Sequence, residues 1–142
     1  MYAKILVAVD STPESTDVLA HARELALATG SPVHVLHVQS YEVLGGIGVG
    51  GQIVEDETEA DAAGFVQASV DALTSAGVTA DGSTVELSRD SIADEIRAEV
   101  KQTGADLLII GTRRHGSLAT VFLGSVSDGI VHHAPCPLLL VP

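Results

Sequence analysis

Short apolar runs alternate along the chain with segments of helical periodicity, and this alternation limits the possible folds more than any other feature. Runs rich in Val, Ile and Leu predict strands at 4–9, 33–38, 83–87, 106–110 and 137–141. Helical patterns fill the intervals at about 11–30, 55–76, 91–104 and 125–133. Such alternation requires parallel strands joined by right-handed crossovers, which place helices on both faces of the sheet. The chain is therefore predicted to form one α/β domain over residues 1–142, a doubly wound, Rossmann-like sheet of five parallel strands in the order 3-2-1-4-5.

Glycines mark the ends of the first three predicted helices, at Gly30, Gly77 and Gly104. The interval 40–54, after the second predicted strand, is different because it contains five glycines and no helical pattern. Part of it satisfies G-x-G-x-x-G, but the dinucleotide fingerprint must follow a strand directly and open a helix, and this stretch does neither. The interval is predicted to be a glycine-rich loop or flap on the carboxyl-end side of the sheet, and its part from Gly45 to Gly51 is predicted to be mobile without ligand.

The charge balance excludes several classes of partner. Seven Lys and Arg residues stand against 19 Asp and Glu, a formal net charge of −12. Nucleic acids and anionic membranes are bound mainly through basic side chains, so neither is an expected partner. The sequence has no 18-residue apolar run, and its only cysteine, Cys136, has no internal disulfide partner. These features predict a soluble, unexported protein of the cytoplasm.

Two of the seven basic residues are adjacent in a glycine-rich segment that follows the fourth predicted strand. Gly111 allows the chain to turn, Arg113 and Arg114 follow, and Gly124 and Ser125 begin the last predicted helix. A helix N-terminus binds anions well because its amides are unpaired and its dipole is positive there. In doubly wound sheets, ligands bind beyond the carboxyl ends of the strands, which is where this segment lies. Two interpretations remain, a solvated loop before a well-capped helix or a phosphate-binding segment.

Four stretches of the sequence resemble the universal stress protein family, and the resemblance covers essentially the whole chain. They are KILVAVDSTPES at 4–15, HVLHV at 34–38, ADLLIIGT at 105–112 and LGSVSDGIVHHAPCPLLLV at 123–141. The resemblance implies the fold described above. It also implies a binding or signalling module rather than an efficient enzyme.

ATP-binding members of this family carry a loop of the form G-x-x-G, nine residues, then G-[ST]. Gly111 matches the first position and the pair Gly124 and Ser125 matches the last. Arg114 occupies the position of the second glycine, and the nine residues 115–123 keep the register. A glycine there permits a positive φ or a close approach of the backbone. Arg114 is therefore expected to weaken ATP binding without abolishing it.

The resemblance implies a role for each matching position. Ala8, Val9 and Asp10 would lie near the adenine and ribose, with Asp10 as the polar contact, and the backbone of Val38 would meet the adenine. For Asp10 the alternative is that it only caps the next helix. The phosphates would be lined by residues of the glycine-rich segment: Gly111, Arg113, Arg114, Gly124, Ser125, Val126 and Ser127. The implied ligand is ATP, or ADP or AMP, with Mg²⁺ as an accompanying ion.

No metal-binding residues are predicted. His34 and His37 are three apart in a predicted strand and so point to opposite faces of the sheet. His132 and His133 are adjacent near a helix end, where a cation suits the dipole. No pair has zinc spacing with a third ligand. Cys136, between two prolines, is expected to pack as a small apolar side chain.

Three functions remain open at this point. They are a nucleotide-binding module in stress response or signalling, the same fold acting without nucleotide through dimerisation and protein partners, and a slow ATP hydrolase. No catalytic residue is predicted, because the site segments hold no general base or carboxylate pair beyond Asp10. The apolar strand Leu138–Val141 would lie at the sheet edge, and the resemblance implies a homodimer in which it pairs antiparallel with its symmetry mate.

Overall fold

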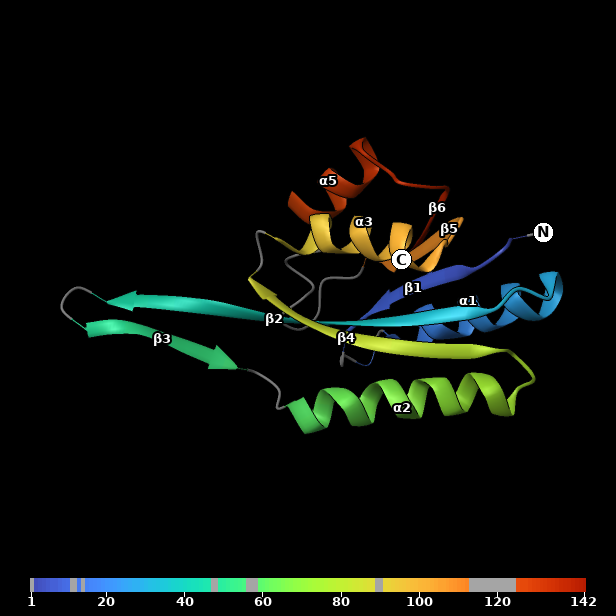
Figure 1. Cartoon of the computed structure of the whole chain (residues 1–142), viewed down its shortest axis with the longest axis horizontal. Helices are drawn as coiled ribbons and strands as arrows, with labels where there is room; N and C mark the ends of the chain where they lie inside the picture. Colours follow the sequence, from blue (N-terminus) through green and yellow to red (C-terminus); the bar gives the residue numbers. More distant parts are fainter. Residues whose placement is uncertain are drawn as a thin grey trace.

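The computed structural model describes residues 2–10, 13, 15–46, 49–55, 59–88, 91–112 and 125–142. One sheet forms its centre, and the parallel strands run in the order β4-β2-β1-β5-β6 (Figure 1). These strands are β1 (Ile5–Val9), β2 (Val33–Gly46), β4 (Ala80–Ser88), β5 (Leu107–Gly111) and β6 (Leu138–Val141). The predicted order of the five parallel strands, 3-2-1-4-5, is confirmed.

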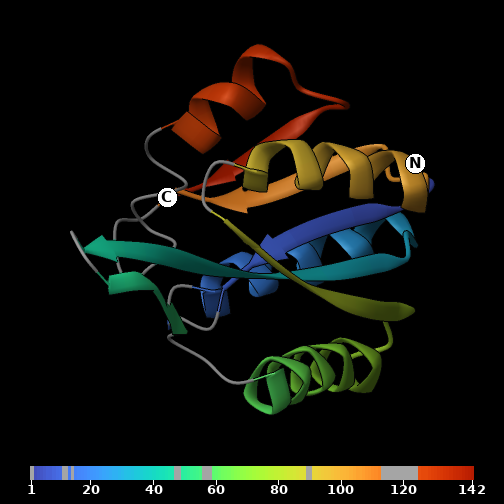
Figure 2. The same ribbon diagram turned by 60° about the vertical axis from the view of Figure 1, so that its left-hand side comes forward.

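Helices cover both faces of the sheet, as the alternation predicts. They are α1 (Ser15–Thr29), α2 (Glu59–Ser75), α3 (Ile92–Thr103) and α5 (Ser125–His132). Successive residues of β1 point to opposite faces, so Ile5 and Val7 pack with α1 and α2, whereas Leu6 and Ala8 pack with α3 and α5. Figure 2 shows α3 and α5 next to each other on one side of the sheet, with α2 on the other. None of the described helices has the length and apolar character needed to cross a bilayer.

The described part of segment 40–54 forms an antiparallel hairpin, so the prediction of a loop is wrong for these residues. The mobility of Gly45–Gly51 stays a prediction. β2 continues to Gly46, and β3 (Val49–Glu55) pairs with it from Tyr41↔Glu55 to Gly46↔Val49. The sequence signal for strands was the β-branched and aromatic content on either side of the glycines, in YEVL and QIVE. The pairing register shifts between Leu44 and Gly46, as at a β-bulge. In Figure 1 this hairpin projects beyond the rest of the sheet.

The three glycines predicted to end helices all have the left-handed backbone conformation. Their φ angles are 72° at Gly30, 93° at Gly77 and 72° at Gly104. Only glycine adopts such angles easily, which is why these positions end the helices. Other element ends differ from the predicted ones by a few residues, since α2 begins at Glu59 and β4 at Ala80.

Candidate functional site

The carboxyl ends of three strands bring the predicted nucleoside contacts to one level of the sheet. Val9 and His37 form the last pair in the parallel register of β1 and β2. The residues that follow them, Asp10 and Val38, are therefore neighbours at the carboxyl ends of these strands. On the other side of β1, the register places Gly111 level with Val9. The buried members of the group are Ala8, Val9 and Val38. Residues distant in the sequence therefore meet at the edge where ligands bind in such sheets.

Asp10 is held by Ser15, the first residue of α1. The Ser15 Oγ lies 2.6 Å from the Asp10 carbonyl oxygen and 3.0 Å from Asp10 Oδ1, and it accepts a 3.2 Å hydrogen bond from the Asp10 amide. Ser15 is only 4% exposed, so these contacts are shielded from water. These contacts join the end of β1 to the first residue of α1, and both roles considered for Asp10, ligand contact and helix cap, stay predictions. Ser15 was not singled out from the sequence, although it lies within the stretch DSTPES.

Gly111 lies where the end of β5 passes close to α1. A Cβ built at Gly111 would be 2.9 Å from Cγ2 of Val18, closer than real Cβ contacts come. Gly111 does not have a positive φ, so this position requires small size rather than a special turn. Thr112 follows, and its amide donates to the Val141 carbonyl oxygen at 2.8 Å. The start of the glycine-rich segment is therefore fixed between α1 and β6.

The last helix begins at the predicted residue, Ser125, and its first turn contains Val126 and Ser127. The remaining predicted phosphate contacts lie outside the described residues: Arg113, Arg114 and Gly124. Their roles stay predictions.

Contacts with α3 position α5. Arg97 Nη1 donates a 3.0 Å hydrogen bond to the Gly129 carbonyl oxygen, and Ile130 is fully buried in the core shared with α3. These contacts fix the direction of α5, and with it the direction in which its N-terminal amides point.

The hairpin places β3 next to the same edge of the sheet. Tyr41 pairs with Ser88 of β4 and also with Glu55 of β3. Because a strand has only two edges, β3 must lie on the edge of β2 that β1 occupies up to His37. Four residues lead from His37 to Tyr41, about 13 Å at 3.3 Å per residue. β3 therefore lies in line with β1, beyond Asp10, an arrangement that the sequence did not indicate.

The two histidines of β2 lie on opposite faces, as predicted. His34 Nε2 is 3.2 Å from Oε1 of Glu99 in α3, whereas the His37 ring packs against Phe65 of α2 with the ring centroids 4.9 Å apart. Within the described ranges, no three His, Cys, Asp or Glu side chains form a group that could hold a metal ion.

Cys136 and Asp106 lie at the opposite, amino-terminal end of the strands. Burial raises the pKa of the Cys136 thiol, and the nearby Asp106 carboxylate raises it further, so the thiol is a weak nucleophile. Asp106 accepts hydrogen bonds from the amides of Ala3 at 3.0 Å and Lys4 at 3.2 Å. Those two bonds, the first above all, hold the pKa of Asp106 below its usual value of 3.8.

The whole chain, residues 1–142, matches the model of the Universal stress protein family. The universal stress protein Sll1388 of Synechocystis sp. is 31% identical to it over 153 residues, covering 99% of this chain and 97% of that protein. A universal stress protein of Thermus aquaticus is 33% identical over 143 residues, covering 99% of each.

Solved structures of this family have the same fold. A family member from Burkholderia pseudomallei superposes with a TM-score of 0.74 at 23% identity, covering 99% of this chain and 96% of that chain. The universal stress protein from Archaeoglobus fulgidus, solved in complex with dAMP, has a TM-score of 0.66 at 24% identity, with 99% and 98% covered. A family protein from Arabidopsis thaliana with AMP bound has a TM-score of 0.61 at 19% identity, with 98% and 90% covered.

Proposed function

Because the chain belongs to the universal stress protein family, we propose that it is a nucleotide-binding module of the stress response whose ligand is an adenine nucleotide, ATP foremost. The observation that carries the proposal is the convergence of Asp10, Val38 and Gly111 at one level of the sheet. From Gly111, the glycine-rich segment leads to the first turn of α5 at Ser125. The dAMP and AMP bound to the two solved family members support the choice of an adenine nucleotide.

The adenine and ribose end of the ligand is assigned to the ends of β1 and β2. The pairing of β2 with β1 stops at His37, and its pairing with β3 on the same edge starts at Tyr41. Val38 lies between these two paired stretches, so its backbone pairs with neither β1 nor β3 on this edge of β2. This supports a role in contacting the adenine through main-chain atoms. Asp10, held by Ser15, supplies the polar group for the ribose.

The phosphates are assigned to the first turn of α5 and to the segment before it. The amides of Ser125, Val126 and Ser127 belong to a helix N-terminus, which favours an anion through its unsatisfied donors and its dipole. Arg113 supplies a cation in a chain whose net charge of −12 otherwise disfavours anions. Arg114, at the position of a family glycine, reduces the affinity without removing it, and Mg²⁺ accompanies the nucleotide.

The active form is assigned as a cytoplasmic homodimer that acts through protein partners. β6 is the last strand of the described sheet, and Leu140 on it is 43% exposed. An apolar edge strand of this kind tends to pair with another strand, and antiparallel pairing of Leu138–Val141 with its symmetry mate provides one.

The test is isothermal titration calorimetry of the purified protein with ATP, ADP and AMP, together with analysis of any nucleotide that co-purifies. We expect saturable binding of one nucleotide per protomer, abolished by Gly124→Val. Gly64→Ala serves as the matched control, because a Cβ at Gly64 in α2 meets no atom within 4 Å. If neither the wild type nor Arg114→Gly binds any of the three nucleotides, the protein acts without nucleotide and the proposal is wrong.

A further inference from the structure

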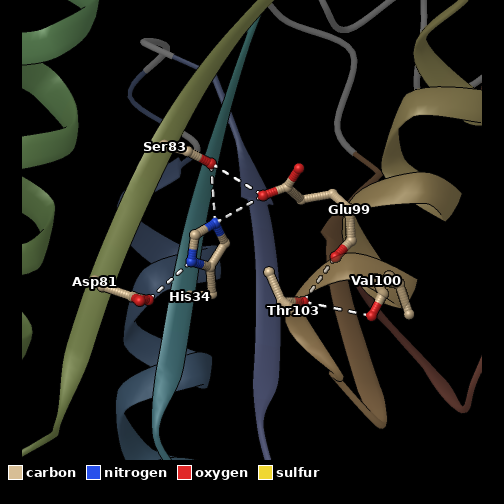
Figure 3. Close-up of polar contacts among 6 residues, drawn as sticks. All are labelled: His34, Asp81, Ser83, Glu99, Val100 and Thr103. Carbon is tan, nitrogen blue, oxygen red and sulfur yellow. Dashed lines mark hydrogen bonds and ion pairs between the residues drawn. The ribbon is translucent and has the colours of Figure 1, made fainter.

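A groove lies between α1 and α2, on the face of the sheet opposite the His34 side chain. On the His34 face the imidazole fills the space between the sheet and α3, where it contacts Asp81, Ser83 and Glu99 (Figure 3). On the other face, α1 packs on β1 and β5, and α2 packs on β2 and β4. Helices that cover neighbouring pairs of strands are about 10 Å apart, twice the spacing of the strands. The side chains between the two helices therefore decide whether this space is filled.

Small side chains leave the space open, with a volume of about 330 Å³. Each helix lines the groove with residues of one face, from Thr16 to Arg23 on α1 and from Phe65 to Leu73 on α2. Three of the lining residues are alanines: Ala20, Ala68 and Ala72. Pockets of about 300–1,000 Å³ with mostly apolar walls are typical of sites for small molecules.

The walls of the groove are apolar and held in place by the core. Leu19 of α1 and Phe65 of α2 are partly buried against it, and the Phe65 ring packs on the His37 ring. The hydroxyl of the buried Ser69 is turned back into its own helix, where it donates to the Phe65 carbonyl oxygen at 2.9 Å. A polar group placed against these walls would lose water without gaining a partner. The groove therefore suits an apolar body.

Among the described residues that line the groove, Arg23 alone carries a charge. It is the last lining residue of α1, so this charge lies at one end of the groove. The guanidinium is 3.0 Å from Oε1 of Glu24, but the two side chains are 46% and 70% exposed, and such a pair is weak. A guanidinium has five N–H donors and binds carboxylates well, so a second carboxylate can bind it beside Glu24.

We propose that this groove binds a small amphipathic carboxylate, of the class of a medium-chain fatty acid. Its chain lies between Leu19 and Phe65, and its carboxylate lies on Arg23. The groove is about 11 Å long at 1.5 Å per helical residue, which is shorter than the roughly 15 Å of hydrocarbon in one leaflet of a bilayer. Asp10, Val38 and Gly111 do not line the groove, so the inference goes beyond the proposed nucleotide site.

The test is titration of the ¹⁵N-labelled full-length protein with octanoate, followed through its amide NMR signals. We expect saturable shifts centred on the α1 and α2 residues of the groove. Hexanoate should bind about fourfold more weakly, because two fewer methylenes are buried in a half-open groove. Octylamine should bind more weakly than octanoate, because Arg23 repels its charge. No saturable shift in these helices up to about 10 mM octanoate, or stronger binding of octylamine, overturns the proposal.

Two pairs of variants test the two ends of the ligand. Arg23→Gln should weaken octanoate about threefold to fivefold, the effect of an exposed ion pair, and leave the binding of neutral 1-octanol unchanged. Lys101→Gln, at an exposed basic residue of α3, should change neither. Ala68→Trp fills the groove and should abolish octanoate binding, whereas Ala63→Trp, at an exposed alanine of α2 outside the groove, should not.

Unchanged octanoate binding in Ala68→Trp, or an equal loss of octanoate and 1-octanol in Arg23→Gln, overturns the proposal. If Ala68→Trp does not fold, the difference between octanoate and 1-octanol in Arg23→Gln decides. Shifts of the same signals with protein concentration alone would also overturn it, because the groove would then be a contact between two copies of the chain.

Discussion

Replacing Gly111 by alanine tests how the start of the glycine-rich segment is positioned. The new Cβ would be 2.9 Å from Val18 Cγ2, whereas carbon atoms pack best at about 3.5–4.0 Å. Val18 cannot yield easily, because it is buried in α1 and β-branched side chains have one strongly preferred rotamer in a helix. Overpacking of this kind costs about 1–3 kcal/mol. The entropy that glycine loses on folding offsets about 0.5–1 kcal/mol. We therefore expect Gly111→Ala to lower the free energy of unfolding by about 1–2 kcal/mol.

A double-mutant cycle separates this clash from other causes. Val18→Ala alone should cost about 2 kcal/mol, through the lost burial and the cavity that it leaves. In the double variant the Cβ at position 111 enters the space that Cγ2 vacates. The double variant should therefore lose about as much unfolding free energy as Val18→Ala alone. Its loss would then be smaller than the sum of the two single losses by about 1 kcal/mol or more, which is the coupling energy of the pair.

The assay is urea-induced unfolding, with unchanged m-values as the check that all variants unfold in the same way. Gly64→Ala is the control for the substitution itself. It lies in α2 with no atom within 4 Å of the new Cβ, and it should stabilise the protein by up to about 1 kcal/mol. Two results would refute the close-approach explanation for Gly111. One is a double variant whose loss of unfolding free energy equals the sum of the two single losses within about 0.5 kcal/mol. The other is a Gly111→Ala variant that is more stable than the wild type.

The remaining predictions concern acid stability, assembly and the phosphate segment. The folded-state pKa of Asp106 lies below its unfolded value of about 3.8, so its contribution is present above that pH and is lost as the pH falls below it. Asp106→Asn should remove this part of the acid dependence in urea unfolding, and an unchanged pH profile would contradict it. For the proposed homodimer, we expect the wild type to sediment as a dimer and Leu140→Lys as a monomer in analytical ultracentrifugation. Leu27→Lys, at a similarly exposed residue of α1, should sediment as the wild type does, and a dimer that persists in Leu140→Lys would contradict pairing through β6. Arg113→Ala should weaken ATP binding and Arg114→Gly should tighten it in calorimetry, and weaker binding by Arg114→Gly would make Arg114 a ligand.

The order of the parallel strands and the faces of the helices were predictable because each depends on side-chain spacing within a short stretch. A run of Val, Ile and Leu predicts a strand buried on both faces, and the right-handed crossover then limits how such strands connect. The ends of three helices were predictable for a similar local reason, since Gly30, Gly77 and Gly104 adopt a backbone conformation that other residues avoid. The edge at which Asp10, Val38 and Gly111 meet follows from that topology.

The tertiary structure decided which distant groups meet, because register and helix placement depend on the whole chain. Local composition in 40–54 suggested a loop, but pairing between β2 and β3 made it a hairpin. The small size of Gly111 is explained only by the position of Val18 on α1. From the sequence, His34 could be placed only on a predicted strand, facing away from His37 and so unable to bind a metal ion together with it. Its partners, Asp81 and Glu99, reach it only because β4 pairs with β2 and α3 packs across that face of the sheet.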